Sequence, residues 1–208
     1  IDYMDHNWKF GAVSFALPSG ERELTEAVEA ATSKPLADIE ALSGKLVDAG
    51  IAENLTDEQK ASLKGNIALI ARGKITFSDK IKNAQEAGAL GVIVTNNQDG
   101  SPFGMGGDGK FEIPAIMISK ALGVKLREQM ALGAVVADMK APEKIEKPEL
   151  IDTLTGFSSR GPRSLDALMK PEIASPGEMI ISADMGKGNA GVKMSGTSMA
   201  APHMAGVM

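Results

Sequence analysis

Two short apolar runs separated by one helical pattern constrain the fold of this chain more than any other feature. The runs are Ile67–Ala71 and Gly91–Thr95, each of the length expected for a buried strand. Between them lies a helical pattern that Ser78 is placed to cap and Gly88 is placed to end. Its apolar face consists of Ile81, Ala84 and Ala87. A strand, a helix and a second strand at these lengths predict a crossover unit whose strands are parallel neighbours.

The same alternation continues towards the C-terminus. Ile113–Ile118 predicts a further strand, Ser119 caps the next predicted helix, and Ala134–Met139 predicts the last strand of this region. The inward face of that helix is expected to consist of Leu122, Leu126 and Met130, with Gly133 at its end. The chain from 65 to 139 is therefore predicted to be an α/β domain.

The N-terminal portion favours β-structure. Trp8–Leu17 alternates between apolar and polar residues with one slip at Gly11, which is typical of a strand with a bulge. Residues 21–25 follow a Pro-Ser-Gly turn and are expected to pair back as a hairpin. Within residues 26–64, Thr56 followed by Asp-Glu-Gln indicates a helix start, whereas the other segments fit a helix or a short strand.

An octapeptide near the C-terminus points to chemistry. Gly196-Thr197-Ser198-Met199-Ala200-Ala201-Pro202-His203 places a serine between small residues, where a run able to form a helix begins. The N-terminus of a helix directs unpaired N–H groups and a partial positive charge at whatever lies over Ser198. Such an arrangement suits a nucleophile that stands beside donors for an oxyanion. Taken alone, a Gly-Thr-Ser triplet is more commonly a turn or a helix cap.

This octapeptide resembles the active-site serine segment of the subtilisin-like serine proteases (subtilases), with Ser198 on the nucleophile. Two upstream segments, 157–162 (FSSRGP) and 170–177 (KPEIASPG), resemble the segments that lead to the serine in that family. The family more commonly has Asp, Ala and Val at the positions of Glu172, Ser175 and Met204. The resemblance implies a secreted serine endopeptidase that cleaves proteins through an acyl-enzyme on Ser198. Gly196 and Thr197 would shape the approach to the hydroxyl, and the Ser198 N–H would donate to the oxyanion.

The α/β region resembles the protease-associated (PA) domain, clearly over about residues 60–140 and weakly over 25–60. The matching residues are Ile67–Gly73, Phe77, Lys80, Ala84, Gly88-Ala89 before Val92-Ile93-Val94, and Ile113-Pro114-Ala115 before Ile118-Ser119. The family often has a cysteine near the position of Ile75, which this chain lacks. The resemblance implies a compact β/β/α domain, an open β-barrel-like sheet with flanking helices. Such domains are commonly inserted in subtilase catalytic domains and are thought to govern the access of substrates or partners.

The two resemblances together divide the chain. Residues 1–25 are assigned to the catalytic domain before the insertion, 26–142 to the PA domain, 143–149 to a charged, proline-containing linker, and 150–208 to the C-terminal catalytic segment. The last segment would belong to a subtilisin-like parallel sheet whose other strands lie elsewhere. We therefore expect the chain to be a piece of a longer protein. Its tail is expected to be partly disordered, misplaced or exchanged with a second copy.

The base that serine proteolysis requires is missing from the predicted site. His203 lies five residues past Ser198 on the same predicted helix, about 140° around its axis, and so points away from the hydroxyl. We interpret it as a structural histidine, and His6 as an ordinary surface or hairpin histidine. Subtilases carry their residues in the order Asp, His, Ser. The Asp, the His and the oxyanion asparagine are therefore expected upstream, and the isolated chain is expected to be inactive.

Composition excludes several other functions. The net charge of −5, without a Lys/Arg cluster, argues against a nucleic-acid partner, and no apolar run is long enough to cross a membrane. No cysteine is present, which excludes disulfides and thiol chemistry. Asp99 and Asp108, near the Gly104–Gly109 loop, could ligate calcium, but a mobile surface loop is the preferred interpretation. No cofactor is expected in this piece, although calcium is an option for the whole enzyme.

Three further interpretations stay open. Arg160 could contact substrate, but we favour a role in anchoring its loop. The chain could serve as a PA interaction module with a vestigial catalytic remnant. It could also derive from a subtilase-like pseudoenzyme whose upstream half lacks the Asp or the His. The oligomeric state and the substrate preference do not follow from the sequence.

Overall fold

A computed structural model describes residues 8–145, 153–178 and 180–208. The chain divides into two compact units, one formed by residues 9–144 and the other by the terminal segments, chiefly 145–208. Each unit is described by itself.

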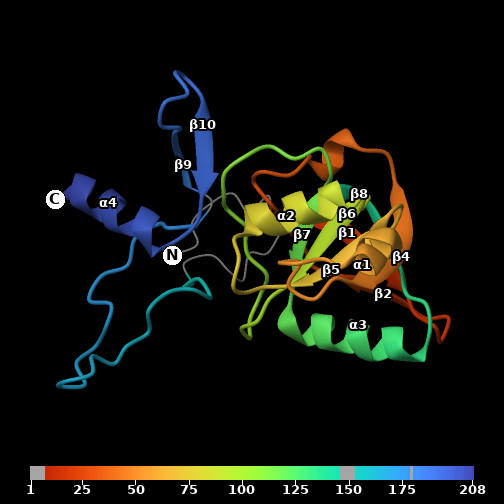
Figure 1. Cartoon of the computed structure of the whole chain (residues 1–208). Coiled ribbons are helices and arrows are strands. Elements are labelled where there is room, and N and C mark those ends of the chain that lie inside the picture. The colour runs from red at the N-terminus through yellow and green to blue at the C-terminus, as the bar shows by residue number, and fades with distance from the viewer. Residues whose placement is uncertain (1–7, 146–152, 179) are drawn as a thin grey trace. The chain divides into compact units, whose positions relative to one another are not determined.

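The larger unit is built on an eight-stranded mixed sheet (Figure 1). Its strands are β1 (Trp8–Ala16), β2 (Arg22–Thr25), β3 (Val28–Glu29), β4 (Leu42–Asp48), β5 (Ile67–Ala71), β6 (Gly91–Thr95), β7 (Ala115–Ile118) and β8 (Val136–Ile145). The strand order is β2-β1-β8-β4-β5-β6-β7-β3. The pairs β4–β5, β5–β6 and β6–β7 are parallel, whereas β1–β2, β4–β8 and β3–β7 are antiparallel.

The predicted crossover unit is confirmed. Strands β5 and β6 are parallel, with Ile67 opposite Gly91 and Ala71 opposite Thr95, and α2 (Phe77–Glu86) connects them. The predicted cap of this helix was wrong. The cap is Thr76, whose hydroxyl accepts a hydrogen bond from the Asp79 amide at 3.1 Å. Ser78 lies inside the first turn, where its Oγ donates to the Asp108 carbonyl at 2.7 Å.

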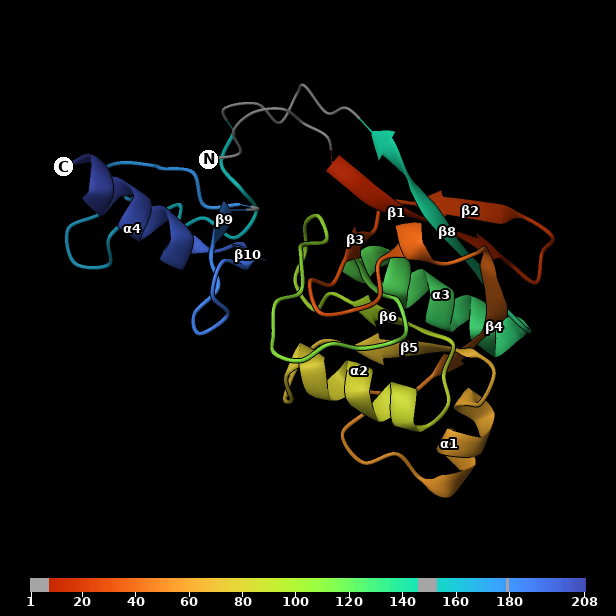
Figure 2. The same ribbon diagram turned by 90° about the horizontal axis from the view of Figure 1, so that it is seen from above.

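Helices cover both faces of the central strands. On one face, α3 (Lys120–Leu132) buries Leu122 and Leu126, as predicted, against side chains from β1, β5, β6 and β8. On the other face, α1 (Asp57–Leu63) and α2 pack their apolar side chains against the alternate residues of β5, β6 and β7. Figure 2 shows α3 between β6 and β8, with α1 and α2 beyond β5. Because β1 and β8 share a core with α3, the sheet curves around that helix.

The region that the sequence left open, residues 26–64, contains little helix. It holds β3, a single 3-10 turn η1 (Leu36–Asp38), β4 and α1. Thr56 forms the predicted start of α1 with a complete capping box. Its hydroxyl accepts from the Gln59 amide at 3.2 Å, and the Gln59 side chain accepts from the Thr56 amide at 3.0 Å. Two donors at the helix start are thereby satisfied reciprocally.

The ends of the larger unit differ from the expected domain boundaries. Strand β8 extends to Ile145, so the first part of the expected linker 143–149 is strand, and 146–149 lie outside the described residues. Pro142 lies in this continuation, beyond Met139, where the recorded pairing with β4 ends. The hairpin β1–β2 belongs to the same sheet, and the assignment of residues 1–25 to a catalytic domain stays a prediction.

In its described residues, 153–178 and 180–208, the smaller unit contains an antiparallel hairpin and one helix. The hairpin joins β9 (Ile180–Ala183) to β10 (Gly191–Met194), with Gly191 opposite Ala183. The helix α4 runs from Thr197 to Val207 and contains Pro202. Within residues 153–178 and 180–208, β9–β10 is the one strand pair recorded, so the parallel sheet expected for this segment has no counterpart there. None of the helices in the described residues has the length and apolarity to span a bilayer.

Candidate functional site

The predicted nucleophile lies at the N-terminus of α4. Gly196 is the cap of this helix, Thr197 is its first residue and Ser198 its second. The Met199 and Ala200 amides donate to the Gly196 carbonyl at 3.0 and 3.4 Å. Helix geometry leaves the Thr197 and Ser198 amides without an intrahelical acceptor. The exposed Ser198 side chain lies in the first turn of α4, and the use of the Ser198 amide as an oxyanion donor stays a prediction.

The three segments that carry the subtilase resemblance contact one another in pairs. The Gly196 amide donates to the Gly177 carbonyl at 2.7 Å, which ties segment 170–177 to the start of α4. A Cβ at Gly177 would lie 2.9 Å from the Gly196 carbonyl oxygen, so only glycine allows this approach. A Cβ at Gly161 would lie 2.9 Å from the Lys170 carbonyl oxygen, and φ at Gly161 is +60°. Segment 157–162 thus lies against the beginning of segment 170–177.

The described residues do not supply a base to Ser198. His203 is exposed on α4, and no hydrogen bond between it and Ser198 is recorded in the described part of the chain. His6 lies outside the described residues. Arg160 is exposed, and neither of its two interpretations is tested by this position. The upstream Asp, His and Asn stay predictions.

The glycine-rich loop between β6 and β7 is anchored, although we expected it to be mobile. The Met105 side chain is fully buried, and its carbonyl accepts from the Ala31 amide at 3.0 Å. The Phe103 ring packs edge-on against Phe77 with centroids 6.2 Å apart, and the Arg72 guanidinium lies 4.8 Å from the centre of the Phe103 ring. These contacts fix a loop whose glycines had indicated only flexibility.

The same loop gives little support to a calcium site. The Asp99 carboxylate lies 3.1 Å from Lys120 Nζ, and the Asp108 carbonyl accepts from Ser78. Within the described residues, no group of three or more Asp, Glu, His or Cys side chains is arranged to hold a metal ion. Calcium binding by the whole protein stays a prediction.

One buried charge was not recognised as such from the sequence. Lys80 on α2 is fully buried, and its Nζ donates to the Ile51 carbonyl at 2.8 Å. Burial lowers the pKa of Lys80, and the nearby Glu53 carboxylate opposes that shift. Next to it, Asn83 Nδ2 donates to the Ala52 carbonyl at 2.7 Å. The two side chains fasten the 50–55 loop to α2, a structural role that the position of Lys80 beside Ile81 and Ala84 could have indicated.

A further polar network joins α3 to the carboxyl ends of the parallel strands. Arg127 Nε lies 2.8 Å from Asp48 Oδ2, at the end of β4. Its Nη1 donates to Thr95 Oγ1 at 3.4 Å and to the Gly123 carbonyl at 3.3 Å. Its Nη2 is buried without a recorded partner among the described residues. The network holds α3 in place over β6, and no sequence pattern predicts it because its members lie far apart in the chain.

Comparisons with known proteins now add to this geometry. The family model of the PA domain matches residues 42–126. The C5a peptidase of Streptococcus pyogenes is 38% identical over 164 residues, covering 74% of this chain and 13% of the relative. The minor extracellular protease Vpr of Bacillus subtilis is 36% identical over 186 residues, covering 82% of this chain and 21% of the relative. The chain thus spans a small part of these proteases.

A solved structure is similar to the larger part of the chain. The zinc aminopeptidase BSAP from Bacillus subtilis has a TM-score of 0.50 and 30% identity, covering 62% of this chain and 30% of that protein. The larger unit, residues 9–144, makes up about two thirds of the chain. The matches to the C5a peptidase and to Vpr exceed that share and therefore continue into residues 145–208. Residues 42–126 are thus a PA domain, carried by a chain that is similar to proteases over most of its length.

Proposed function

We propose that this chain is part of a subtilisin-like serine endopeptidase, in which a PA domain accompanies the C-terminal segment of the catalytic domain. The whole enzyme would hydrolyse peptide bonds in proteins through an acyl-enzyme on Ser198. The arrangement of the smaller unit carries this proposal. Three segments that resemble the subtilase serine region contact one another through Gly161, Gly177 and Gly196, and end with Ser198 at the start of α4.

The character of α4 supports a position inside a larger catalytic domain. The helix contains no Asp, Glu, Lys or Arg, and His203 is its one histidine. None of its residues is buried in the described structure. A helix that is apolar on all sides normally lies in the core of a large protein. Large exposed apolar side chains elsewhere in the same unit include Leu165, Leu168, Met169, Ile173, Ile181 and Met185. We infer that other parts of a longer protein cover these surfaces.

The proposed chemistry uses few groups of this chain. Ser198 Oγ would attack the carbonyl carbon of the scissile peptide bond, and the Ser198 amide would donate a hydrogen bond to the oxyanion that forms. The absence of a side chain at Gly196 and the small Thr197 would let the substrate reach the hydroxyl. The base, the residue that orients it and the second oxyanion donor would come from outside the chain. The 208-residue piece is therefore proposed to be inactive, because a triad without its base retains little activity.

The PA domain is proposed to affect the access of protein substrates or partners to the catalytic domain. A secreted enzyme is proposed by analogy with Vpr, whose name describes an extracellular protease. We propose that no nucleic acid is bound, because the net charge is −5. A role for calcium is proposed only for the whole enzyme.

A fluorophosphonate probe tests the catalytic proposal directly, because it forms a covalent bond with an activated serine. The longer natural protein is expected to be labelled at Ser198, and Ser198→Ala is expected to abolish this labelling. The 208-residue chain is expected to show no labelling above the Ser198→Ala background. Strong labelling of the short chain would overturn the proposed inactivity, and an unlabelled longer protein would overturn the proposed protease.

A second candidate is a non-catalytic role as a PA interaction module or as a subtilase-like pseudoenzyme. It is favoured by the structural similarity to a zinc aminopeptidase, because proteins of different catalytic type then share this fold. The sequence of the longer protein separates the candidates. An Asp-[Ser/Thr]-Gly segment and a His-Gly-Thr segment upstream support the enzyme, whereas substitutions at these positions support the pseudoenzyme.

A further inference from the structure

We propose that the outer edge of β2 binds an extended peptide segment that carries a basic side chain. In the described part of the chain, β2 is the terminal strand of the eight-stranded sheet. An unpaired strand edge can accept a further strand through its main-chain groups, and neighbouring pockets then select side chains. This inference concerns residues 17–25 and α3, and it does not depend on the proposed protease activity.

The pairing of β1 with β2 shows which backbone groups face outward. Glu21 and Leu17 lie opposite each other, and the Leu17 amide donates to the Glu21 carbonyl at 2.9 Å. Hydrogen-bonded and non-hydrogen-bonded pairs alternate along an antiparallel ladder. Counted from Leu17–Glu21, the first and the third following pairs are Ala16–Arg22 and Ser14–Leu24, and both are therefore of the non-hydrogen-bonded kind. The N–H and C=O groups of Arg22 and Leu24 therefore point away from β1, towards the free edge.

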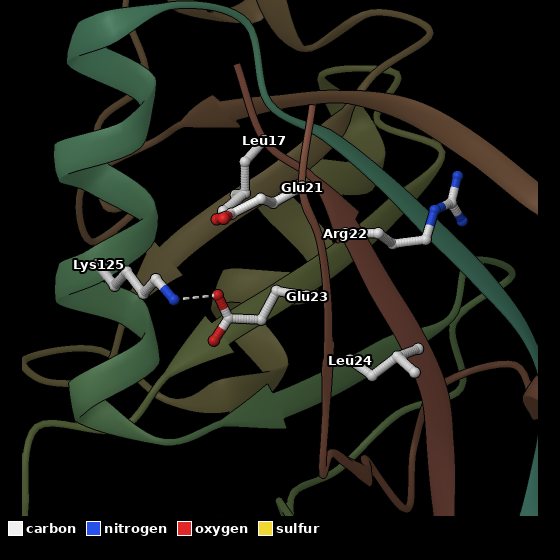
Figure 3. A pocket seen from close by; sticks show the side chains of 6 residues that line it. All are labelled: Leu17, Glu21, Arg22, Glu23, Leu24 and Lys125. Atoms are coloured by element: carbon white, nitrogen blue, oxygen red, sulfur yellow. Dashed lines mark ion pairs between the residues drawn. The ribbon is translucent and has the colours of Figure 1, made fainter. Parts of the chain in front are cut away.

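A groove of about 450 Å³ accompanies this edge (Figure 3). It is lined by Leu17, Glu21, Arg22, Glu23, Leu24 and Lys125. Lys125 extends from α3 towards β2, and its Nζ lies 2.5 Å from Glu23 Oε2. The hydrogen bond to Glu23 raises the pKa of Lys125, with a smaller contribution from the charge of Glu21. An added strand would run beside β2, and its side chains would lie next to these groups.

The charges in the groove do not cancel. Glu23 is compensated by Lys125, whereas the exposed Glu21 carboxylate faces the same side. The Arg22 guanidinium is directed to the other side, where its Nη1 lies 2.9 Å from Asp138 Oδ2 and donates to Ser14 Oγ at 3.1 Å. One negative charge is therefore in excess in the groove. A lysine or arginine of the bound segment would complement it, and the exposed Leu24 side chain, on the opposite face of β2, offers an apolar contact to the alternate residues of that segment.

The experiment measures binding of two fluorescent peptides to the 208-residue chain by anisotropy. One peptide alternates valine with lysine, and the other alternates valine with glutamate. We expect the lysine peptide to bind and the glutamate peptide to bind at least about fivefold more weakly. This difference combines the attraction of Glu21 for lysine with its repulsion of glutamate, each of the size of an exposed charge interaction. Glu21→Lys is expected to invert this preference. The matched control is Glu112→Lys, an exposed charge reversal in the loop between β6 and β7, which is expected to leave the preference unchanged.

A second pair of variants tests the strand pairing itself. Leu24→Pro removes the outward N–H without removing a hydrogen bond to β1, because a proline is compatible with the free side of an edge strand. It is expected to reduce binding of the lysine peptide at least fivefold, whereas Leu24→Ala, which keeps the N–H, is expected to reduce it less. Amide exchange by NMR supplies an independent measurement. The Arg22 and Leu24 amides are expected to be protected only when the peptide is bound.

Each of three results would overturn the proposal. The first is equal binding of both peptides to the unmodified chain, and the second is unaltered binding of the lysine peptide to Leu24→Pro. The third is protection from amide exchange at residues other than 22 and 24 when the peptide is bound. Concentration-dependent dimerisation that Leu24→Pro abolishes would assign the edge to a second copy of the chain, and this too would overturn the peptide proposal. Circular dichroism of each variant shows whether a loss of binding comes from a loss of the fold. If Leu24→Pro is unfolded, Arg22→Pro replaces it, because Arg22 carries the other outward amide.

Discussion

Gly123 is expected to be indispensable for the packing of α3 on β6, and the structure gives the size of the effect. A Cβ at this position would lie 2.5 Å from Thr95 Cγ2 and 2.6 Å from Thr95 Cβ. Thr95 is buried in β6 and cannot move without its strand. Gly123→Ala would therefore separate α3 from the sheet and would also disturb Arg127, which bonds to the Thr95 hydroxyl and the Gly123 carbonyl.

Two opposing contributions determine the magnitude. Overpacking of a well-filled core costs about 1–3 kcal/mol, whereas alanine is better than glycine inside a helix by about 1 kcal/mol. Because the added Cβ would lie 2.5 Å from a side chain of a buried strand, we expect overpacking in the upper part of its range and a net loss of about 1–2 kcal/mol in the free energy of unfolding. With a urea dependence of about 2 kcal/mol per molar, the midpoint of unfolding is expected to fall by about 0.5–1 M. Urea titration followed by far-UV circular dichroism measures this shift.

Two companions make the test specific. Gly106→Ala places its Cβ where no heavy atom lies within 4 Å, so its stability is expected to stay within about 0.5 kcal/mol of the wild type. Thr95→Ser removes Cγ2 and leaves Cβ in place, so in combination with Gly123→Ala it is expected to restore only part of the loss. A Gly123→Ala protein as stable as the wild type, or more stable, would refute the reasoning from close packing.

Three other predictions concern a charge, a cap and a glycine. Because burial lowers the pKa of Lys80 in the fold, the unfolded chain binds more protons than the folded chain at alkaline pH. The stability of the wild type is therefore expected to rise relative to that of Lys80→Met as the pH increases towards 10.5. Urea midpoints measured between about pH 8 and pH 10.5 test this, and an equal pH dependence of the two midpoints would contradict it. Thr56→Ala removes the hydroxyl of the α1 capping box and is expected to cost about 1 kcal/mol in the same titration, a value that Thr56→Ser should largely recover. Gly177→Ala brings a Cβ within 2.9 Å of the Gly196 carbonyl oxygen and is expected to accelerate proteolysis between residues 170 and 200, whereas cleavage at the wild-type rate would show that this contact is dispensable.

Local patterns predicted the centre of the larger unit well. Strands β5, β6 and β7 and helices α2 and α3 were predicted because their apolar residues follow the period of the element and because serine, threonine and glycine mark the ends. The cap of α2 was predicted two residues too late, since Thr76 and Ser78 are equally good caps by residue type. In the structure the Ser78 hydroxyl donates to the carbonyl of Asp108, a distant residue that the local pattern does not reveal.

Features that depend on distant pairing were predicted less well. The continuation of β8 to Ile145 passes through Pro142 and charged residues that resemble a linker, and only its position beside β1 explains why it stays extended. The anchored loop around Met105 could not be inferred from its glycines, because its contacts come from residues 31 and 77–78. At the candidate site, the prediction of Ser198 rests on its neighbours in the sequence, and the upstream base, which the described residues do not supply, stays a prediction.

The adjacency of β1 and β8 in the sheet has a consequence for how such a unit is carried by a longer protein. Figure 2 shows the first residues of β1 and the last residues of β8 at the same end of the sheet. The two ends of residues 9–144 therefore lie next to each other, so a longer protein can carry this unit as an insertion in a single surface turn. A graft of residues 9–144 into an unrelated scaffold at a tight turn should fold without stretching either junction.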